Sequence, residues 1–134
     1  MINEHEKVMK AACQKCIDTC EECKQACHEV VESVDHDHSQ FVREECATNC
    51  QEVIDACNAC IDACHKQLEH NREHVKVIHI EECIKKCYEC IASAQTCLDH
   101  CKSNDIHCHE VCKKCSHACN ECIRACRKCL DDSE

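Results

Sequence analysis

Cysteine recurs along this chain at the three- and four-residue spacing of a heptad repeat, and all 22 cysteines follow it. Residues at this spacing share one face of an α-helix, so a face that normally carries Leu and Ile carries sulfur. The cysteines form four groups, and within each group the steps are three, four or seven residues. The groups are Cys13, Cys16, Cys20, Cys23 and Cys27; Cys46, Cys50, Cys57, Cys60 and Cys64; Cys83, Cys87, Cys90, Cys97 and Cys101; and Cys108, Cys112, Cys115, Cys119, Cys122, Cys126 and Cys129.

Four long helices account for this pattern, because the chain contains neither Gly nor Pro and nothing in it forces a helix to break. Short polar connections between helices imply antiparallel neighbours. We therefore expect an all-α protein, a single domain over residues 1–134, that folds as an antiparallel up-down-up-down four-helix bundle with a cysteine-lined core. The expected helices span about 3–33, 40–69, 73–103 and 106–131, with connections at 34–39, around 70–72 and at 103–105.

The heptad register shows how completely cysteine fills the expected core. With Cys13 at position a and Cys16 at position d, the four cysteine-bearing segments contain 24 a and d positions, of which 22 are cysteine. The two exceptions are Val53 and Ala94. Large apolar residues gather at position e and alanines at position g, which allows neighbouring helices to interlock around a thiol-lined centre.

Charge and hydropathy exclude several classes of partner. A formal net charge of −10 argues against nucleic acid and against an anionic membrane surface. No apolar run approaches the roughly 20 residues needed to span a bilayer. The first residues lack a basic region followed by an apolar one, so no export signal is expected. We therefore expect a cytoplasmic protein, whose thiols are kept reduced.

The chemistry of a thiol-lined helix face is that of a site for soft metal ions. Cysteines three or four residues apart have Cβ atoms about 5–6 Å apart, so two thiolates can grip one ion between them. Thiolate sulfur selects Cu(I), and it also binds Zn(II) and Cd(II). Cu(I) accepts two or three ligands, whereas Zn(II) requires four in a tetrahedron and therefore needs helices to converge at every site. We expect all 22 cysteines to bind metal, with Cu(I) stored or sequestered in many copies per chain.

Two other functions remain open at this point. A metallothionein-like buffer for Zn(II) or Cd(II) would use four thiols per ion, and a thiol redox bundle would cycle through disulfides. A disulfide scaffold is disfavoured for two reasons: no export signal is expected, and a disulfide between neighbours on one helix does not connect different helices. We expect no enzymatic activity, since no Ser/His/Asp or lone Cys/His arrangement and no Gly-rich phosphate loop stands out.

Histidines indicate where ions would enter the bundle. In an up-down-up-down topology the first and third connections lie at the same end, which brings His36 and His38 toward His107 and His109, the two residues that flank Cys108. Imidazoles at the mouth of a thiol core can receive ions and pass them inward. We expect the mouth of the bundle at this end.

In its helical phase, cysteine count and expected bundle architecture, the chain resembles the bacterial copper storage proteins, a cysteine-rich four-helix-bundle family. The resemblance covers essentially the whole chain and rests on pairs such as Cys16/Cys20 and Cys115/Cys119 and on the His107-Cys108-His109 sequence. It implies storage of many Cu(I) ions in a preformed bundle that fills from one end. It also implies a homo-oligomer, often a tetramer, and copper chaperones or transporters as partners. With only two methionines, the chain is similar to the leaderless, cytosolic branch of that family.

Overall fold

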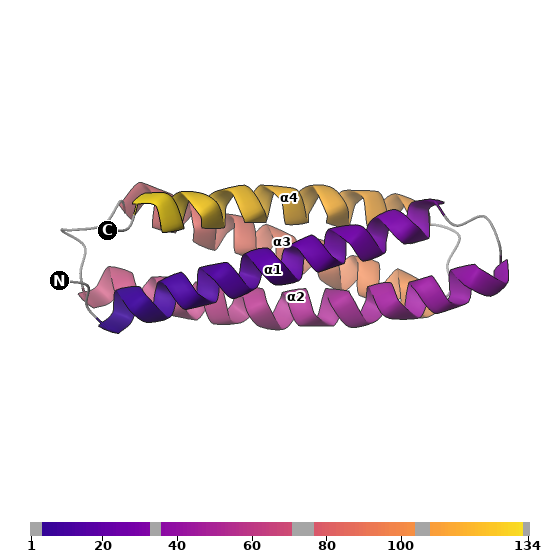
Figure 1. The fold of residues 1–134 in the computed structure, drawn as a ribbon, viewed down its shortest axis with the longest axis horizontal. Coiled ribbons are helices and arrows are strands. Elements are labelled where there is room, and N and C mark those ends of the chain that lie inside the picture. The colour runs from indigo at the N-terminus through magenta and orange to yellow at the C-terminus, as the bar shows by residue number, and fades with distance from the viewer. Residues whose placement is uncertain (1–3, 33–35, 71–76, 104–107, 133–134) are drawn as a thin grey trace.

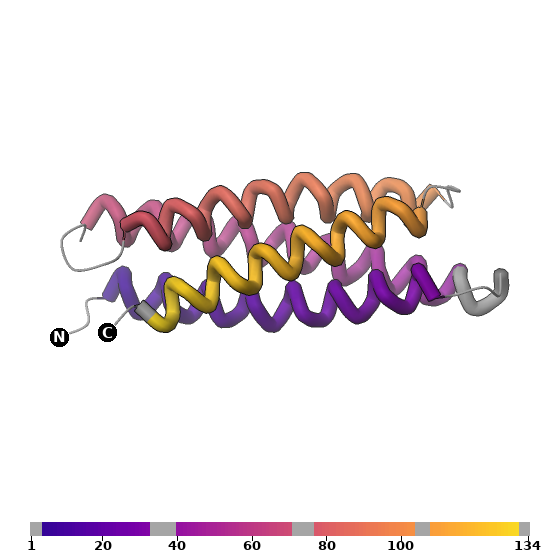
Figure 2. The backbone as a smooth tube through the Cα atoms, turned by 90° about the horizontal axis from the view of Figure 1, so that it is seen from above, coloured from indigo at the N-terminus to yellow at the C-terminus, as the bar shows by residue number. Residues whose placement is uncertain are grey.

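The structure, a computed structural model, describes residues 4–32, 36–70, 77–103 and 108–132 (Figure 1). Successive helices run in opposite directions along one long axis, so that α1 begins and α4 ends at the same end of the molecule (Figures 1 and 2). The expected all-α, up-down-up-down four-helix bundle is therefore confirmed. The helices are α1 (Glu4–Glu32), α2 (His36–His70), α3 (Val77–Ser103) and α4 (Cys108–Asp132).

Each helix packs against two neighbours. The helix α1 contacts α2 and α4, and α3 contacts the same two helices. Over the described residues, the backbones of the diagonal pairs, α1 with α3 and α2 with α4, do not approach one another closely. The result is a square bundle whose a and d side chains fill one central space.

The second helix begins earlier than the sequence pattern predicts. The polarity of residues 36–39 predicts a connection, but α2 starts at His36. Polar side chains without apolar periodicity are compatible with a helix that extends beyond the core, and no Gly or Pro is present to end it. The predicted helices 3–33 and 106–131 agree with α1 and α4 to within two residues. The parts of the predicted connections at 34–35, 71–72 and 104–105 lie outside the described residues.

Sulfur dominates the interior of the bundle. All 22 cysteines are buried and all are free thiols. Nineteen of them have no exposed surface, and the remaining three, near helix ends, are Cys101 (5% exposed), Cys108 (3%) and Cys129 (2%). Val53 and Ala94, the two other residues of the predicted register, are also completely buried. The predicted heptad phase is therefore confirmed along all four helices.

The outer faces of the helices are polar. Among the described residues, ion pairs that connect different helices include Arg127 with Glu21 at 3.1 Å and Lys86 with Glu121 at 3.6 Å. Exposed pairs of this kind contribute little to stability, which therefore depends mainly on the interior. No helix in the described parts of the chain is long and apolar enough to cross a membrane.

The end of the bundle where α1 begins is filled by side chains other than cysteine. Met9 and Ile80 are buried there, and Gln67, three residues after Cys64, is completely buried at a d position. Neither the nitrogen nor the oxygen of the Gln67 carboxamide has a hydrogen-bond partner among the described residues. A buried amide in this state costs free energy, because the hydrogen bonds that it makes with water in the unfolded chain are lost.

Replacing Gln67 by Leu is expected to stabilise the metal-free protein by about 1–3 kcal/mol, because the substitution removes a buried amide and keeps a similar volume. Urea unfolding of the reduced, metal-free protein measures the change. The matched control is Gln14→Leu, since Gln14 is exposed and donates a 3.0 Å hydrogen bond to Asp18 on the surface. That change should stay within about 0.5 kcal/mol of zero. Destabilisation by Gln67→Leu would show that the carboxamide is solvated or bonded in the folded protein.

Candidate metal centre

Thiols from different helices touch one another along the whole length of the bundle. The distance between Sγ atoms is 3.7 Å for Cys13 and Cys60, near the end where α1 begins. It is 3.6 Å for Cys16 and Cys122, nearer the middle of the bundle. Sulfur atoms at such distances form weak S–H···S hydrogen bonds, and groups of these contacts follow one another along the core.

The contacts follow a single register within each helical hairpin. Between α1 and α2, partner numbers always add up to 73, as in Cys27 with Cys46 and Cys23 with Cys50. Between α3 and α4 they add up to 209, as in Cys97 with Cys112, except near the start of α4, where Cys112 also contacts Cys101. A constant total means that the two helices pair symmetrically about the connection between them. The position of each connection therefore decides which thiols meet across a hairpin.

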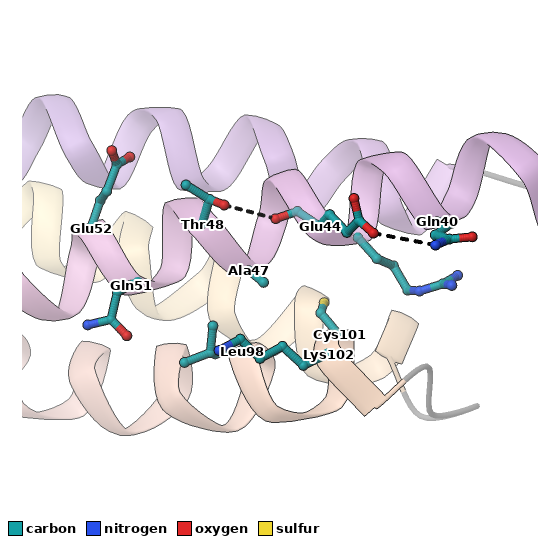
Figure 3. Close-up of a pocket in the computed structure, with 10 residues that line it drawn as sticks. Gln40, Glu44, Ala47, Thr48, Gln51, Glu52, Leu98, Cys101 and Lys102 are labelled. Atoms are coloured by element: carbon teal, nitrogen blue, oxygen red, sulfur yellow. Dashed lines mark hydrogen bonds between the residues drawn. The ribbon is translucent and has the colours of Figure 1, made fainter.

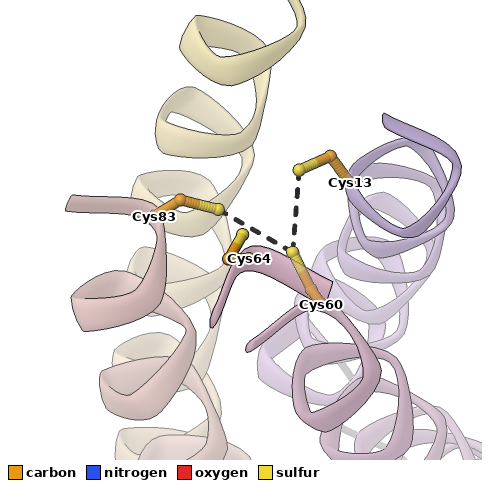
Figure 4. Close-up of side chains that lie close together, drawn as sticks. All are labelled: Cys13, Cys60, Cys64 and Cys83. Atoms are coloured by element: carbon orange, nitrogen blue, oxygen red, sulfur yellow. Dashed lines mark hydrogen bonds between the residues drawn. The ribbon is translucent and has the colours of Figure 1, made fainter. Parts of the chain in front are cut away.

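Several sets of four buried thiols converge closely enough to hold one ion. Within each set, all Sγ atoms lie within 4.8 Å of one another. Figure 4 shows one set, in which Cys13 from α1, Cys60 and Cys64 from α2 and Cys83 from α3 point toward a common centre. Five such sets are Cys13/Cys60/Cys64/Cys83, Cys16/Cys60/Cys87/Cys126, Cys16/Cys57/Cys87/Cys122, Cys20/Cys57/Cys90/Cys122 and Cys27/Cys46/Cys97/Cys112.

These four-thiol sets supply the convergence of helices that a tetrahedral Zn(II) site requires. A tetrahedral zinc–thiolate site with bonds of about 2.3 Å has sulfur–sulfur edges of about 3.8 Å. Within the sets the sulfur atoms lie no more than 4.8 Å apart, and pairs such as Cys16 and Cys57, at 3.6 Å, are close to such an edge. Convergence is common because each level of the bundle presents thiols from several helices at once. Coordination number therefore gives no preference for Cu(I) over Zn(II).

Neighbouring sets share sulfur atoms. Cys16 and Cys87 belong to two sets, and so do Cys57 and Cys122. Cys60 joins the set at the end of the bundle to the next one. Ions held in adjacent sets would consequently be bridged by common thiolates. The arrangement suits a linked array of metal ions better than a row of isolated sites.

The thiols near the start of α4 differ in acidity. Hydrogen bonds from Cys101 and Cys112 lower the pKa of Cys108 to about 4. Hydrogen bonding to Cys108 and Cys112, together with burial, raises the pKa of Cys101. The sulfur atoms of Cys101 and Cys108 are only 3.3 Å apart. The pair therefore offers one thiolate that is ready to bind a cation, next to a thiol that retains its proton.

Thiols deeper in the bundle fall into two groups, of which one holds its protons more firmly and the other, including Cys16 and Cys83, has a lowered pKa. Hydrogen bonding to Cys122 and to three other cysteines, with burial as the smallest cause, raises the pKa of Cys57 above its ordinary value of 9.0. Cys126 has its pKa raised in the same way by Cys122, and Cys119 by Cys115. In the folded, metal-free protein these thiols stay neutral at a pH where thiols of an unfolded chain ionise. A metal ion that binds them must displace their protons.

The metal-free bundle is therefore expected to lose stability as the pH rises above about 9. Folded-state pKa values are raised at Cys57, Cys119 and Cys126, so the folded protein binds more protons than the unfolded chain in that range. The stabilising contribution is complete below the unfolded pKa and is lost at higher pH. Chemical unfolding under reducing conditions at pH 7 and pH 10 measures the difference. Metal-loaded protein should show a smaller loss, and equal stability at both pH values in the metal-free form would contradict the expectation.

The predicted mouth residues are placed only in part. Cys108 is the first residue of α4, and His109 beside it is exposed. His36 and His38 lie in the first turn of α2, which begins at the end where α4 begins (Figure 1). Their side chains, and the whole of His107, lie outside the described residues. The helix ends thus come together as the topology predicts, whereas contacts among the four histidines remain a prediction.

The opposite end holds a histidine pair that the sequence pattern does not single out. The rings of His5 and His70 stack with centroids 4.0 Å apart and planes within 2° of parallel. The up-down topology brings the start of α1 beside the end of α2, but a stacking contact depends on side-chain conformation. Gln67 is a second residue that the cysteine pattern does not reveal. Continuing the heptad three residues beyond Cys64 would have found it.

Comparisons with known proteins give no match: no family model, no curated protein and no solved structure is similar to this chain. The resemblance to copper storage proteins therefore rests on the cysteine pattern alone. The four-thiol sets, which come from the structure, support metal binding independently of that resemblance.

Proposed function

We propose that this protein stores Cu(I) ions, which the thiolates of its core bind in a linked array. One observation carries the proposal: all 22 thiols are buried inside one bundle, and many of them form sets of four, several of which share sulfur atoms. Packing alone does not require cysteine at nearly every core position, because Leu and Ile fill such positions with more buried apolar area.

Charge favours Cu(I) over Zn(II) as the stored ion. Four thiolates around one Zn(II) leave a net charge of −2, and several such sites would bury a large negative charge in a medium of low dielectric constant. One Cu(I) per thiolate leaves no net charge. Sharing of Cys16, Cys57, Cys87 and Cys122 between sets also suits an ion that is bridged to its neighbours. A Zn(II) or Cd(II) buffer remains the second candidate, because the sulfur spacing fits a tetrahedral site.

An anaerobic titration of fully reduced protein with Cu(I), against a competing chromophoric chelator, tests the proposal. With 22 thiols at two per ion, independent sites would hold 11 ions, and shared sulfurs would hold more. Binding of more than about 11 equivalents supports the Cu(I) store. Saturation near five ions, with Zn(II) preferred in a parallel titration, would identify the Zn(II) or Cd(II) buffer. If no ion binds tightly, the thiol redox bundle, whose cysteines cycle through disulfides, becomes the favoured function.

The same proposal covers the biological setting. We infer a cytoplasmic protein without catalytic turnover, related to the copper storage proteins and assembled as a homo-oligomer. It would exchange copper with chaperones or transporters and would have no nucleic-acid or membrane partner. A net charge of −10 supports the last point, since it disfavours anionic surfaces. His36, His38, His107 and His109 remain the proposed mouth.

A further inference from the structure

A groove between α2 and α3 reaches the sulfur core from the side of the bundle (Figure 3). Its volume is about 760 Å³, within the range of sites that take small molecules. Ala47 and Thr48 line it from α2, and Leu98, Cys101 and Lys102 from α3. Figure 3 shows the Cys101 sulfur directed into the space between the two helices. The groove therefore ends on a thiol.

Cys101 connects this groove to the metal-binding sets. Its exposed fraction, 5%, is the largest of any cysteine in the chain. Its sulfur lies 3.3 Å from that of Cys108 and 3.8 Å from that of Cys112. The sulfur of Cys112 lies in turn 3.4 Å from Cys97 and 3.9 Å from Cys46, both members of one four-thiol set. An ion bound at Cys101 can thus move inward by exchange between sulfur atoms in contact.

Other hollows on the surface have no such connection. One lies between α1 and α2 and includes Thr19 and Ala56, and another lies between α3 and α4 and includes Ser93 and His117. A third, at the far end of the α2–α3 seam, includes Leu68. No cysteine lines any of these three hollows. Access to sulfur distinguishes the groove at Cys101 from them.

We propose that the groove between α2 and α3 receives a peptide-sized thiol complex of Cu(I), and that Cys101 takes the ion from this carrier. The inference rests on the proposed function and adds the donor class and the first acceptor. In the transfer, a bond forms between Cu(I) and the Cys101 sulfur as the bond to the carrier sulfur breaks. The proton of the Cys101 thiol passes to the departing carrier thiolate. Copper remains Cu(I), so no oxidant or reductant is needed.

The walls of the groove carry charges of both signs. Arg43 and Lys102 line it together with Glu44 and Glu52, so the groove offers charged partners for both the carboxylates and the ammonium group of a thiol peptide. Glu44, also in the wall, accepts a 3.4 Å hydrogen bond from Gln40. Carriers with a single exchangeable thiolate suit an acceptor that meets the groove through one sulfur. A folded donor protein would need a wider contact surface.

The test measures transfer of Cu(I) from its glutathione complex to the reduced, full-length protein under anaerobic conditions. The variant Thr48→Trp places an indole in the groove, and we expect transfer to slow by about tenfold at unchanged final capacity. The control is Thr96→Trp. Both threonines are exposed, and each donates a 3.1 Å hydrogen bond to the carbonyl oxygen four residues earlier, but Thr96 is not in the groove wall. Equal rates for the two variants would overturn the inference.

Two further comparisons separate the groove from other routes. Cys101→Ser should slow transfer from the glutathione complex, whereas Cys129→Ser, at the opposite end of the bundle, should not. If His107→Phe with His109→Phe slows transfer and Thr48→Trp does not, ions enter at the helix ends and the groove has no role. Should Thr48→Trp slow only a folded copper-carrying protein, the peptide-sized carrier is wrong. Low capacity in the unmodified protein would instead refute the proposed storage function itself.

Discussion

Loading the core with Cu(I) is expected to raise the midpoint of thermal unfolding by more than about 20 °C over the metal-free protein. The metal-free interior contains mainly Cys, with fewer Ala and larger apolar side chains, and a buried thiol contributes less than a buried Leu or Ile. Metal bonds between helices exist only in the folded state. In small thiolate-rich domains, ion binding contributes about 10 kcal/mol or more to folding.

Circular dichroism at 222 nm, recorded on heating under anaerobic conditions, measures this effect. Helical content at room temperature should change little on loading, because the thiols are already grouped before metal binds. Mg(II), which prefers oxygen ligands, serves as the control ion and should leave the midpoint unchanged. A midpoint that stays constant with Cu(I) would mean that the ions bind outside the core or bind the unfolded chain equally well.

We expect one fourfold alanine variant to lose more bound Cu(I) than another. The first replaces Cys16, Cys57, Cys87 and Cys122, and the second replaces Cys27, Cys46, Cys97 and Cys112. Both variants lose four buried thiols, but each member of the first set also belongs to a second set. The first variant therefore disrupts three of the five sets named above, and the second disrupts one. We expect roughly twice the loss of bound Cu(I) in the first variant, because residues that share partners have non-additive effects.

The same titration against a chelator counts the ions in both variants. Their helical content and hydrodynamic size provide the control for folding, since each variant removes four buried sulfur atoms. Equal losses would indicate that cysteine pairs act independently. In that case the sharing of sulfur atoms between sets would have no effect on storage.

Local information in the sequence predicts the helices and their inward faces. Three- and four-residue spacing determines which side chains share a helix face, so the buried thiols, Val53 and Ala94 could be identified without a structure. The pairing within each hairpin could also have been predicted. Partner numbers that add up to 73 or 209 place the centres of symmetry inside the expected connections at 34–39 and 103–105.

The sets of four thiols could not be predicted in this way. They depend on how far the α1–α2 hairpin is shifted and rotated against the α3–α4 hairpin, as in the contact between Cys16 and Cys122. No local pattern encodes that relation, since it results from packing of whole helix faces. The groove at Cys101 has the same origin, because it depends on side chains from both α2 and α3. Sequence reasoning thus identifies the ligands, and the tertiary structure determines which ligands act together.

Under the proposed function, the register of the hairpins would make storage capacity a matter of molecular length. Because the same rung of thiols repeats with every heptad, an in-register heptad added to each helix would extend the core by about two thiols per helix without redesigning the rest. Capacity could then change gradually during evolution, through duplication or loss of short segments, in the way that a ladder gains or loses rungs. Removing a heptad from one helix alone would keep its a and d positions facing inward, but it would leave thiols of the other helices without partners at one end of the bundle.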